Sequence, residues 1–436
     1  MLYMKIKETF NSSFSGFFLR LLFKDDYQIY LDQTFFGSLL GKICLPLVSE
    51  IALLFAVILF WYEGFLGHYF PFLNLFPVAS ILLILSVIFA DKSKILLKKY
   101  HIWYLFFLLF SGISGLMAAT RGINYSLVAN GFFLFAQFGI AMIAAQGVKN
   151  KKKILAYLVF LSLPFVLTGI FQALSHIRTA STWLSPGETG IETRAFSFFG
   201  SPNVMGLAAA SIFLLSIFLY LENRKKFYML FIAALNLLAV FFSFSRTAWL
   251  GLLLALFLAV IIKRRFLIYL LLLASVLLLI PQIKNRVTRV FMPNYLHDAT
   301  LDGRLWAMIN GFYIAKKHII FGAGPGTYGG QLATGQASPV YLEGIQNGYT
   351  ALYYTDNQFL EILVQVGILG LLAFFGFVVA IFVNLWGNIR RQDNIYLGAL
   401  SIFVCFLVGA VFSNVLEFGA VSVPVAIILG SVMNES

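Results

Sequence analysis

Long apolar runs alternate with short polar junctions along most of this chain. A bilayer core about 30 Å thick needs roughly 20 apolar residues in a helix, and windows of that kind recur about twelve times. The windows cover residues 39–62, 72–90, 101–119, 126–147, 153–175, 202–221, 227–243, 247–262, 266–281, 357–386, 395–413 and 416–433. The pattern predicts an all-α fold, a polytopic membrane helix bundle with about 12 transmembrane helices.

Lysines and arginines gather at every second junction between these runs. The clusters are Lys5 to Lys24, Lys92 to Lys99, Lys149 to Lys153, Arg224 to Lys226, Lys263 to Arg265, and Arg390 with Arg391. Cytoplasmic loops of membrane proteins collect positive charge. We therefore predict that these junctions and both termini are cytoplasmic, and that the long loop from Gln282 to Asp356 is extracytoplasmic.

This spacing divides the chain into four parts. Residues 1–38 form a cytoplasmic segment, either a helix lying at the inner headgroup layer or a partly ordered tail. Residues 39–281 hold about nine spanning helices, 282–356 form the extracytoplasmic loop, and 357–436 hold about three further helices. Inside the loop, apolar positions from Leu305 to Tyr313 predict an amphipathic helix between Arg304 and His318. The glycines from Gly322 to Gly330 then predict a flexible stretch, either a lid over a substrate or a plain cap on the bundle.

Composition agrees with a membrane protein and excludes several other classes. Apolar residues make up 60% of the chain and charged residues 11%, far from the balance of a soluble domain. The net charge of +13 is spread over short loops and not along a groove, so we expect no nucleic-acid binding. Cys44 and Cys405 read as small core residues, and no cleavable signal peptide is evident. The five histidines lack metal-site spacing, so we expect no metal and no cofactor.

Two arginines stand at the edges of apolar runs. Arg246 lies in FFSFSRTAWLG, where the turn between two runs must be close to the outer membrane surface, and Arg194 lies in ETRAFSFFGSPNVMG just before another run. Paired guanidinium groups suit a pyrophosphate, because their planar forks give charge-assisted bidentate hydrogen bonds. Contact with lipid phosphate explains a single arginine equally well.

A third candidate lies where the outer loop meets the next apolar run, in YYTDNQFLEILVQVGILG. Asp356 stands at the start of a predicted helix, where an Asp is often only an N-cap. Its alternative role is that of a general base or orienting group at the membrane surface. Glu361 follows on the same helix, and we add Glu361, Asn357 and Asn203 as candidate contacts to a substrate.

Four stretches together resemble the O-antigen ligase and polymerase family of bacterial membrane glycosyltransferases. They are RAFSFFGSPNVMG, FSFSRTAWLG, GRLWAMINGFYIAKKHIIFGAGPGTYG and DNQFLEILVQVGILG, between about Arg194 and Gly370. The resemblance implies a bundle of about twelve spanning helices in which the long outer loop forms a helical cap, as the hydropathy pattern also predicts.

The resemblance also implies a substrate and a location. The donor would be a polyprenyl-pyrophosphate-linked glycan, transferred to a glycan or lipid acceptor at the outer side of the bacterial inner membrane. Neither a nucleotide nor a metal takes part, and a chain-length regulator is a candidate partner. The family pattern places pyrophosphate-binding arginines at Arg194 and Arg246, with Arg304 a plausible third. Fixed guanidinium groups would stabilise the departing pyrophosphate, while a base activates the acceptor and the anomeric carbon inverts.

The chain departs from the ligase pattern at one position. Ligases of the family carry His before the Asn that follows the loop, whereas this chain has Asp356 before Asn357. The difference favours a polymerase, which joins repeat units, over a ligase. A secondary transporter or a lipid-linked glycan flippase is the alternative from another class, although transporters place ionisable groups at mid-membrane.

Overall fold

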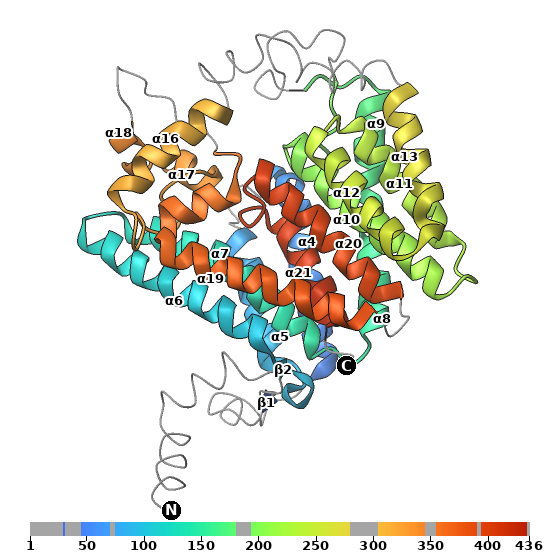
Figure 1. Ribbon diagram of the computed structural model, residues 1–436, viewed down its shortest axis with the longest axis horizontal. Helices are drawn as coiled ribbons and strands as arrows, with labels where there is room; N and C mark the ends of the chain where they lie inside the picture. The colour runs from blue at the N-terminus through green and yellow to red at the C-terminus, as the bar shows by residue number, and fades with distance from the viewer. Residues whose placement is uncertain are drawn as a thin grey trace, which may run out of the picture.

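The computed structural model describes residues 29–30, 45–69, 75–179, 193–279, 304–344, 355–389 and 394–433. Within these ranges the protein is built almost entirely from helices (Figure 1). They are α4 (Pro46–Tyr69), α5 (Leu75–Phe89), α6 (Lys99–Thr120), α7 (Tyr125–Gln146), α8 (Lys151–Leu161), α9 (Leu163–Leu174), α10 (Pro202–Glu222), α11 (Tyr228–Phe242), α12 (Arg246–Ile262), α13 (Leu267–Leu279), α16 (Arg304–Lys317), α17 (Gln331–Gly335), α18 (Val340–Gly344), α19 (Gln358–Ile389), α20 (Asn394–Phe412) and α21 (Gly419–Val432), with short 3₁₀ turns η2 (Lys92–Lys94) and η4 (Arg264–Phe266). Two-residue strands, β1 (Ile29–Tyr30) and β2 (Leu96–Leu97), pair antiparallel. The all-α prediction is confirmed.

Seven helical segments of the described chain are long and apolar enough to cross a membrane. They are α4, α6, α7, α8 together with α9, α10, α19 and α20. The helices α5, α11, α12 and α21 are apolar but shorter. Every predicted window overlaps an apolar helix, but the count of about twelve spans stays a prediction. Residues 1–28 and 31–38 of the predicted N-terminal segment lie outside the described residues.

Small residues let the helices approach closely, as membrane interfaces require. A Cβ added at Gly139 of α7 would overlap the Tyr104 ring of α6, and one at Gly398 of α20 would overlap the Phe218 ring of α10. At Gly430 of α21, an added Cβ would overlap backbone of α7. These glycines fix which helices are neighbours.

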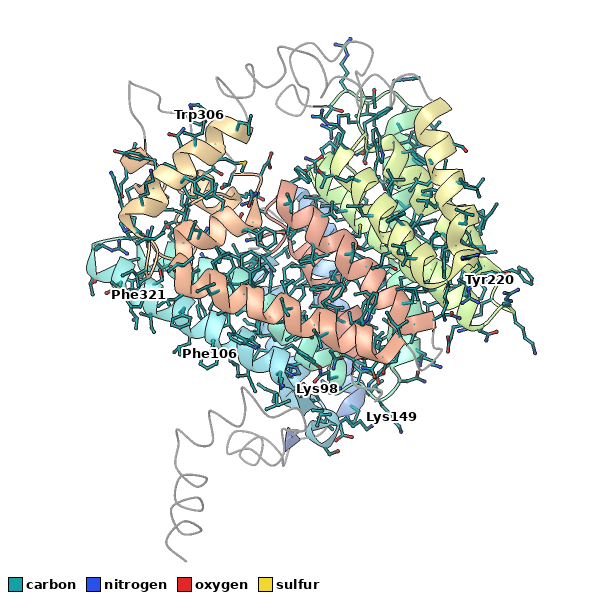
Figure 2. The ribbon with its side chains drawn as sticks, viewed as in Figure 1. Lys98, Phe106, Lys149, Tyr220, Trp306 and Phe321 are labelled. Atoms are coloured by element: carbon teal, nitrogen blue, oxygen red, sulfur yellow. The ribbon has the colours of Figure 1, made fainter. Side chains whose placement is uncertain are left out.

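The basic junctions that lie within the described residues meet at one end of the bundle. The Lys98 ammonium donates to the last carbonyl of α21, at Met433 (2.8 Å), and the Lys149 N–H donates to Glu50 (3.2 Å). Lys263 donates to Asn394 (3.0 Å), where α20 begins. Lys98 and Lys149 lie at the lower end of Figure 2, with Trp306 of the outer loop at the opposite end. The clusters at Lys98, Lys149 and Lys263 thus share one face of the described bundle, and its assignment to the cytoplasm stays a prediction.

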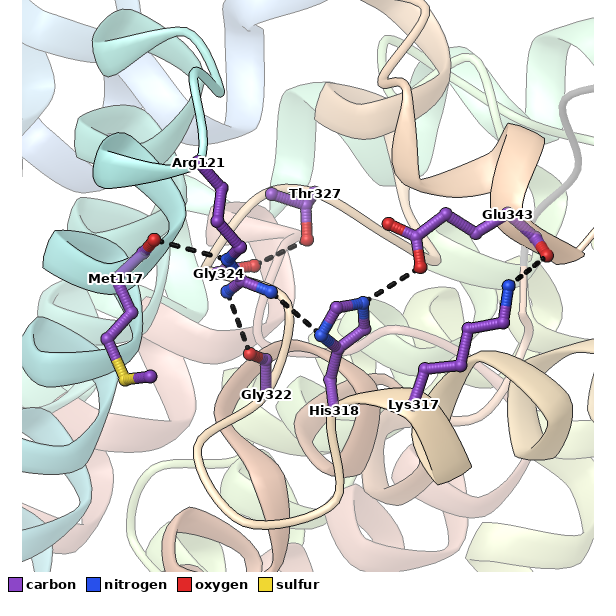
Figure 3. Close-up of polar contacts among 8 residues, drawn as sticks. All are labelled: Met117, Arg121, Lys317, His318, Gly322, Gly324, Thr327 and Glu343. Carbon is purple, nitrogen blue, oxygen red and sulfur yellow. Dashed lines mark hydrogen bonds and ion pairs between the residues drawn. The ribbon is translucent and has the colours of Figure 1, made fainter.

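The described part of the outer loop forms three helices, α16, α17 and α18, grouped beside the start of α19 (Figure 1). The helix expected between Arg304 and His318 is confirmed as α16. Its predicted apolar face is wrong, because Ile309, Phe312 and Tyr313 are exposed and the helix packs through Ala307, Ile314 and Ala315. A polar chain docks this loop on α6 (Figure 3): Arg121 Nη1 lies 2.7 Å from His318 Nδ1, and His318 Nε2 lies 2.8 Å from the Glu343 carboxylate. Arg121 also donates to the Gly322 carbonyl (3.2 Å).

The glycine-rich stretch from Gly322 to Gly330 is buried along its whole length. It fits into a break in α19 at Gly367, whose φ of 79° lies outside the helical range. Around the break, the Ala323 N–H donates to Val364 O (2.8 Å) and the Ile368 N–H donates to Ile319 O (2.8 Å). Loop backbone thus satisfies groups that the break frees. The close packing of these glycines favours the plain cap over the lid, and the choice between the two stays a prediction.

Candidate active site

Arg194 is buried, with 3% of its surface exposed, in the turn that precedes α10. Its Nε donates to the Ser243 carbonyl (3.1 Å) and its Nη2 donates to Asn203 Oδ1 (3.2 Å). The same Asn203 oxygen accepts from the Ser245 hydroxyl (3.1 Å). The network therefore brings Arg194 to the turn that immediately precedes Arg246.

Arg246 is the first residue of α12 and is partly exposed. Ser245 caps the helix by accepting from the Ala248 N–H (3.4 Å), and Ser201 caps α10 in the same manner. Helices α10 and α12 thus begin side by side, joined by the Asn203–Ser245 hydrogen bond. Helix N-termini carry partial positive charge, so this corner combines two helix ends with two guanidinium groups.

Sequence reasoning missed the residues that hold this corner in place. The Thr179 hydroxyl accepts from the Arg194 N–H (2.6 Å) and donates to the Arg194 carbonyl (3.0 Å). Gln172 of α9 accepts from the Ser197 N–H (2.7 Å). Neither residue belongs to a recognisable motif, because their role depends on contacts between segments that only the fold defines.

The second group of candidates lies at the start of α19. Asn357, and not Asp356, caps this helix, because Asn357 Oδ1 accepts from the Leu360 N–H (2.9 Å). Asp356 has a φ of 49°, and its neighbour Thr355 is tied to the outer loop by a bond from its N–H to Gly329 O (2.8 Å). The interpretation of Asp356 as the helix cap is thus corrected.

Glu361, one turn further along α19, is fully buried. It accepts hydrogen bonds from the side-chain amides of Gln358 (2.9 Å), Gln365 (2.9 Å) and Asn414. Its carboxyl group also interacts with that of Glu417, in the turn between α20 and α21. Glu417 accepts from the Gln331 N–H of α17 (2.8 Å), and burial raises its pKa from 4.5 to about 7.

The two groups lie on either side of a shared packing contact. Both groups pack around Gly409 of α20. A Cβ added at Gly409 would lie 3.1 Å from Leu207 of α10, which is one turn after Asn203. It would lie equally close to Val415, which is next to Asn414. Arg304 begins α16 in the loop, but its side chain lies outside what the structure describes. The candidates thus come from α10, α12 and α19 around the outer end of α20.

Backbone strain concentrates beside these candidates. Five non-glycine residues of the described ranges have positive φ. Ser197 lies three residues after Arg194, Phe244 lies two residues before Arg246, and Asp356 is itself a candidate. Strained backbone of this kind costs about 1–3 kcal/mol per residue and clusters at functional sites. The strain therefore favours a functional role for these turns.

The other features of the described chain are less informative. Within those ranges no three His, Cys, Asp or Glu side chains lie together as a metal site, and metal independence stays a prediction. A surface depression lined by Lys263, Arg264, Arg265 and Asn394 lies at the opposite end of α12. Because the residues that line this depression belong to a basic junction, we do not include it in the candidate site.

Residues 231–375 match the model of a protein family described as O-antigen ligase. The match covers about one third of the chain and supports its resemblance to the O-antigen ligase and polymerase family. Arg246, Arg304 and Asp356 lie inside the matched segment, whereas Arg194 and Asn203 precede it. No curated protein matches the chain.

Proposed function

We propose that the protein is a membrane glycosyltransferase that takes glycan from a polyprenyl-pyrophosphate donor at the extracytoplasmic face. The observation that carries the proposal is the hydrogen-bonded corner formed by Arg194, Asn203 and Ser245 at the start of α12. It gathers positive charge at the end of the bundle where the outer loop lies, as transfer of a lipid-linked glycan in a membrane family requires.

Arg246 is the proposed direct contact to the pyrophosphate. Its guanidinium can form bidentate, charge-assisted hydrogen bonds with a phosphate, and the N-termini of α10 and α12 add favourable dipoles. Arg194 contributes its charge from behind Arg246, and its hydrogen bonds to Ser243 and Asn203 hold the turn that precedes α12. Because these groups are fixed before reaction, they stabilise the leaving pyrophosphate as the glycosidic bond breaks.

Asp356 is the proposed general base. In this role the carboxylate takes the proton of the acceptor hydroxyl, whose oxygen forms the new bond to the anomeric carbon as the pyrophosphate leaves with the bonding electrons. Attack from the face opposite the leaving group inverts that carbon. Asn357 supplies the helix cap, so the start of α19 does not depend on Asp356 for capping. Contacts of Arg304, Asn203 and Asn357 to the glycan are proposed at the same site.

The acceptor is proposed to be a second lipid-linked repeat unit, which makes the protein a polymerase. The support is Asp356 in the place of the His of the ligase pattern. The bacterial inner membrane is the proposed location, with a chain-length regulator as a candidate partner. A transporter or flippase is the competing function, and the break of α19 at Gly367 favours it, because transporters use discontinuous helices at substrate sites.

Product analysis separates these functions. Purified protein in liposomes is given a defined polyprenyl-pyrophosphate-linked repeat, and the products are measured by mass spectrometry. A ladder of repeats is the expected result. Transfer to a different acceptor in one step would establish a ligase instead, and movement of unchanged donor across the bilayer without any new linkage would refute the enzyme.

A further inference from the structure

Glu361 and Glu417 form a buried carboxyl pair that joins three parts of the molecule. Glu361 lies on the half of α19 before the break, Glu417 lies in the turn between α20 and α21, and both side chains are almost or fully inaccessible to solvent. The outer loop crosses directly over them. A Cβ added at Gly329 would lie 3.0 Å from Glu361 Cγ, and one at Gly330 would overlap the Glu417 carboxyl.

The amides around Glu361 have their orientation fixed by backbone groups. The Leu416 N–H donates to Gln358 Oε1 (2.7 Å), and the Gly326 N–H donates to Gln365 Oε1 (2.7 Å). A backbone N–H can only donate, so each of these glutamines must turn its NH₂ group toward Glu361. Both Glu361 oxygens therefore accept N–H bonds, so this carboxyl group needs no proton of its own to satisfy its oxygens.

The hydrogen bonds of Glu417 differ from those of Glu361. Its Oε2 accepts from the Gln331 N–H (2.8 Å), while its buried Oε1 has no N–H or O–H donor. Two ionised carboxylates in contact inside a protein repel strongly. A proton on Glu417 Oε1, donated to Glu361, removes that repulsion and satisfies the remaining oxygen.

We propose that Glu361 and Glu417 share one proton, resident on Glu417, and act as a positioning pair that clamps the Gly329–Gln331 turn of the outer loop and so fixes Asp356. The path to Asp356 is short. The Gly329 carbonyl accepts from the Thr355 N–H (2.8 Å), the residue before Asp356, and the Gly329 N–H donates to the Tyr341 hydroxyl (2.7 Å). This inference rests on the proposed role of Asp356 as the base.

Loss of the shared proton should release the clamp. The groups that contact the pair are Gln358 and Gln365 of α19, Asn414 of the α20–α21 turn and the Gln331 N–H of α17. Among the described residues, no cation acts on either carboxyl group. Burial raises the Glu417 pKa. A carboxyl group whose pKa is raised on folding stabilises the fold below its unfolded value, and that stability is lost as the pH rises through the folded value. The window runs from about 4.5 to about 7.

The asymmetry of the pair gives a sharp test with Glu417→Gln and Glu361→Gln. A glutamine at 417 can donate permanently to Glu361 and still accept from Gln331. A glutamine at 361 would face amide donors with an NH₂ group of its own. In purified protein, the melting temperature of the wild type should fall between pH 4.5 and about 7, and that of E417Q should not. Near neutral pH, E417Q should keep more turnover than E361Q. E361Q should lower turnover about tenfold or more, with little change in KM.

The opposite ranking of the two variants would overturn the proton assignment. Equal melting temperature profiles for wild type and E417Q would overturn the shared proton itself. Unchanged turnover in E361Q, with normal folding, would overturn the positioning role. The melting profile requires no glycan transfer, so it still decides the pair if the wild type shows no transferase activity and the proposed function fails.

Discussion

Asp356 and Asn357 are neighbours at the start of α19, and the sequence alone does not decide which of them caps the helix. Asn357 satisfies the helix end, while Asp356 adopts a left-handed backbone with φ of 49°. Asp and Asn tolerate this conformation better than most residues, and the bond between Thr355 and Gly329 holds it. A left-handed Asp that does not cap its helix is consistent with the role proposed for Asp356.

Replacing Asp356 tests this division directly. Asn at 356 keeps the size and the left-handed tolerance of Asp but cannot take a proton, so D356N should lower turnover by about 10²–10⁴-fold with an unchanged melting temperature. The matched control is N357A, which should cost about 0.5–2 kcal/mol of stability through loss of the cap. Unimpaired glycan transfer by D356N would exclude Asp356 as the base.

At the scale of elements, the apolar windows and the existence of helix α16 could be predicted because their signals are local. Hydrophobic runs and helical periodicity depend only on neighbouring residues. The buried course of Gly322–Gly330 could not be predicted, since its glycines face α7 and the break in α19, which are distant in sequence. For the same reason Arg194 and Arg246 were candidates from their positions, whereas the residues that support the Arg194 turn, Thr179 and Gln172, emerged only from the fold.

The break in α19 predicts a contrast between two glycines of one helix. Gly367 has a φ of 79°, and an added Cβ would overlap the Ile320 carbonyl, whereas nothing lies within 4 Å of one at Gly387. G367A should destabilise the protein by at least about 1–3 kcal/mol. G387A should be neutral or stabilising by up to about 1 kcal/mol. Thermal unfolding in detergent measures both, and equal stability of the two variants would contradict the close insertion of the loop.

For the whole molecule, the basic face and the outer loop lie at opposite ends of the bundle (Figure 2). Ion pairs and hydrogen bonds connect the basic junctions to one another, as between Lys152 and Glu222 (3.5 Å). The positive-inside rule assigns this face to the cytoplasm. The candidate site then opens to the side where the outer loop covers the bundle.

Side-specific labelling tests that orientation. Lys152 and Lys316 are both exposed, and each is changed to cysteine in a background without Cys44 and Cys405. A membrane-impermeant maleimide added to intact spheroplasts should label K316C and leave K152C unlabelled until the membrane is opened. The reverse pattern would place the outer loop in the cytoplasm and contradict the predicted topology.

The most direct test of the account compares Arg246→Ala with Arg224→Ala. Both remove one arginine, but Arg224 is exposed near the end of α10, at the basic face. In liposomes with a defined polyprenyl-pyrophosphate-linked glycan, R246A should lose about 10²–10³-fold in turnover, the typical effect of removing a preorganised transition-state donor. R224A should transfer at the wild-type rate. Normal glycan transfer by correctly folded R246A would contradict the central claim that the start of α12 holds the donor pyrophosphate.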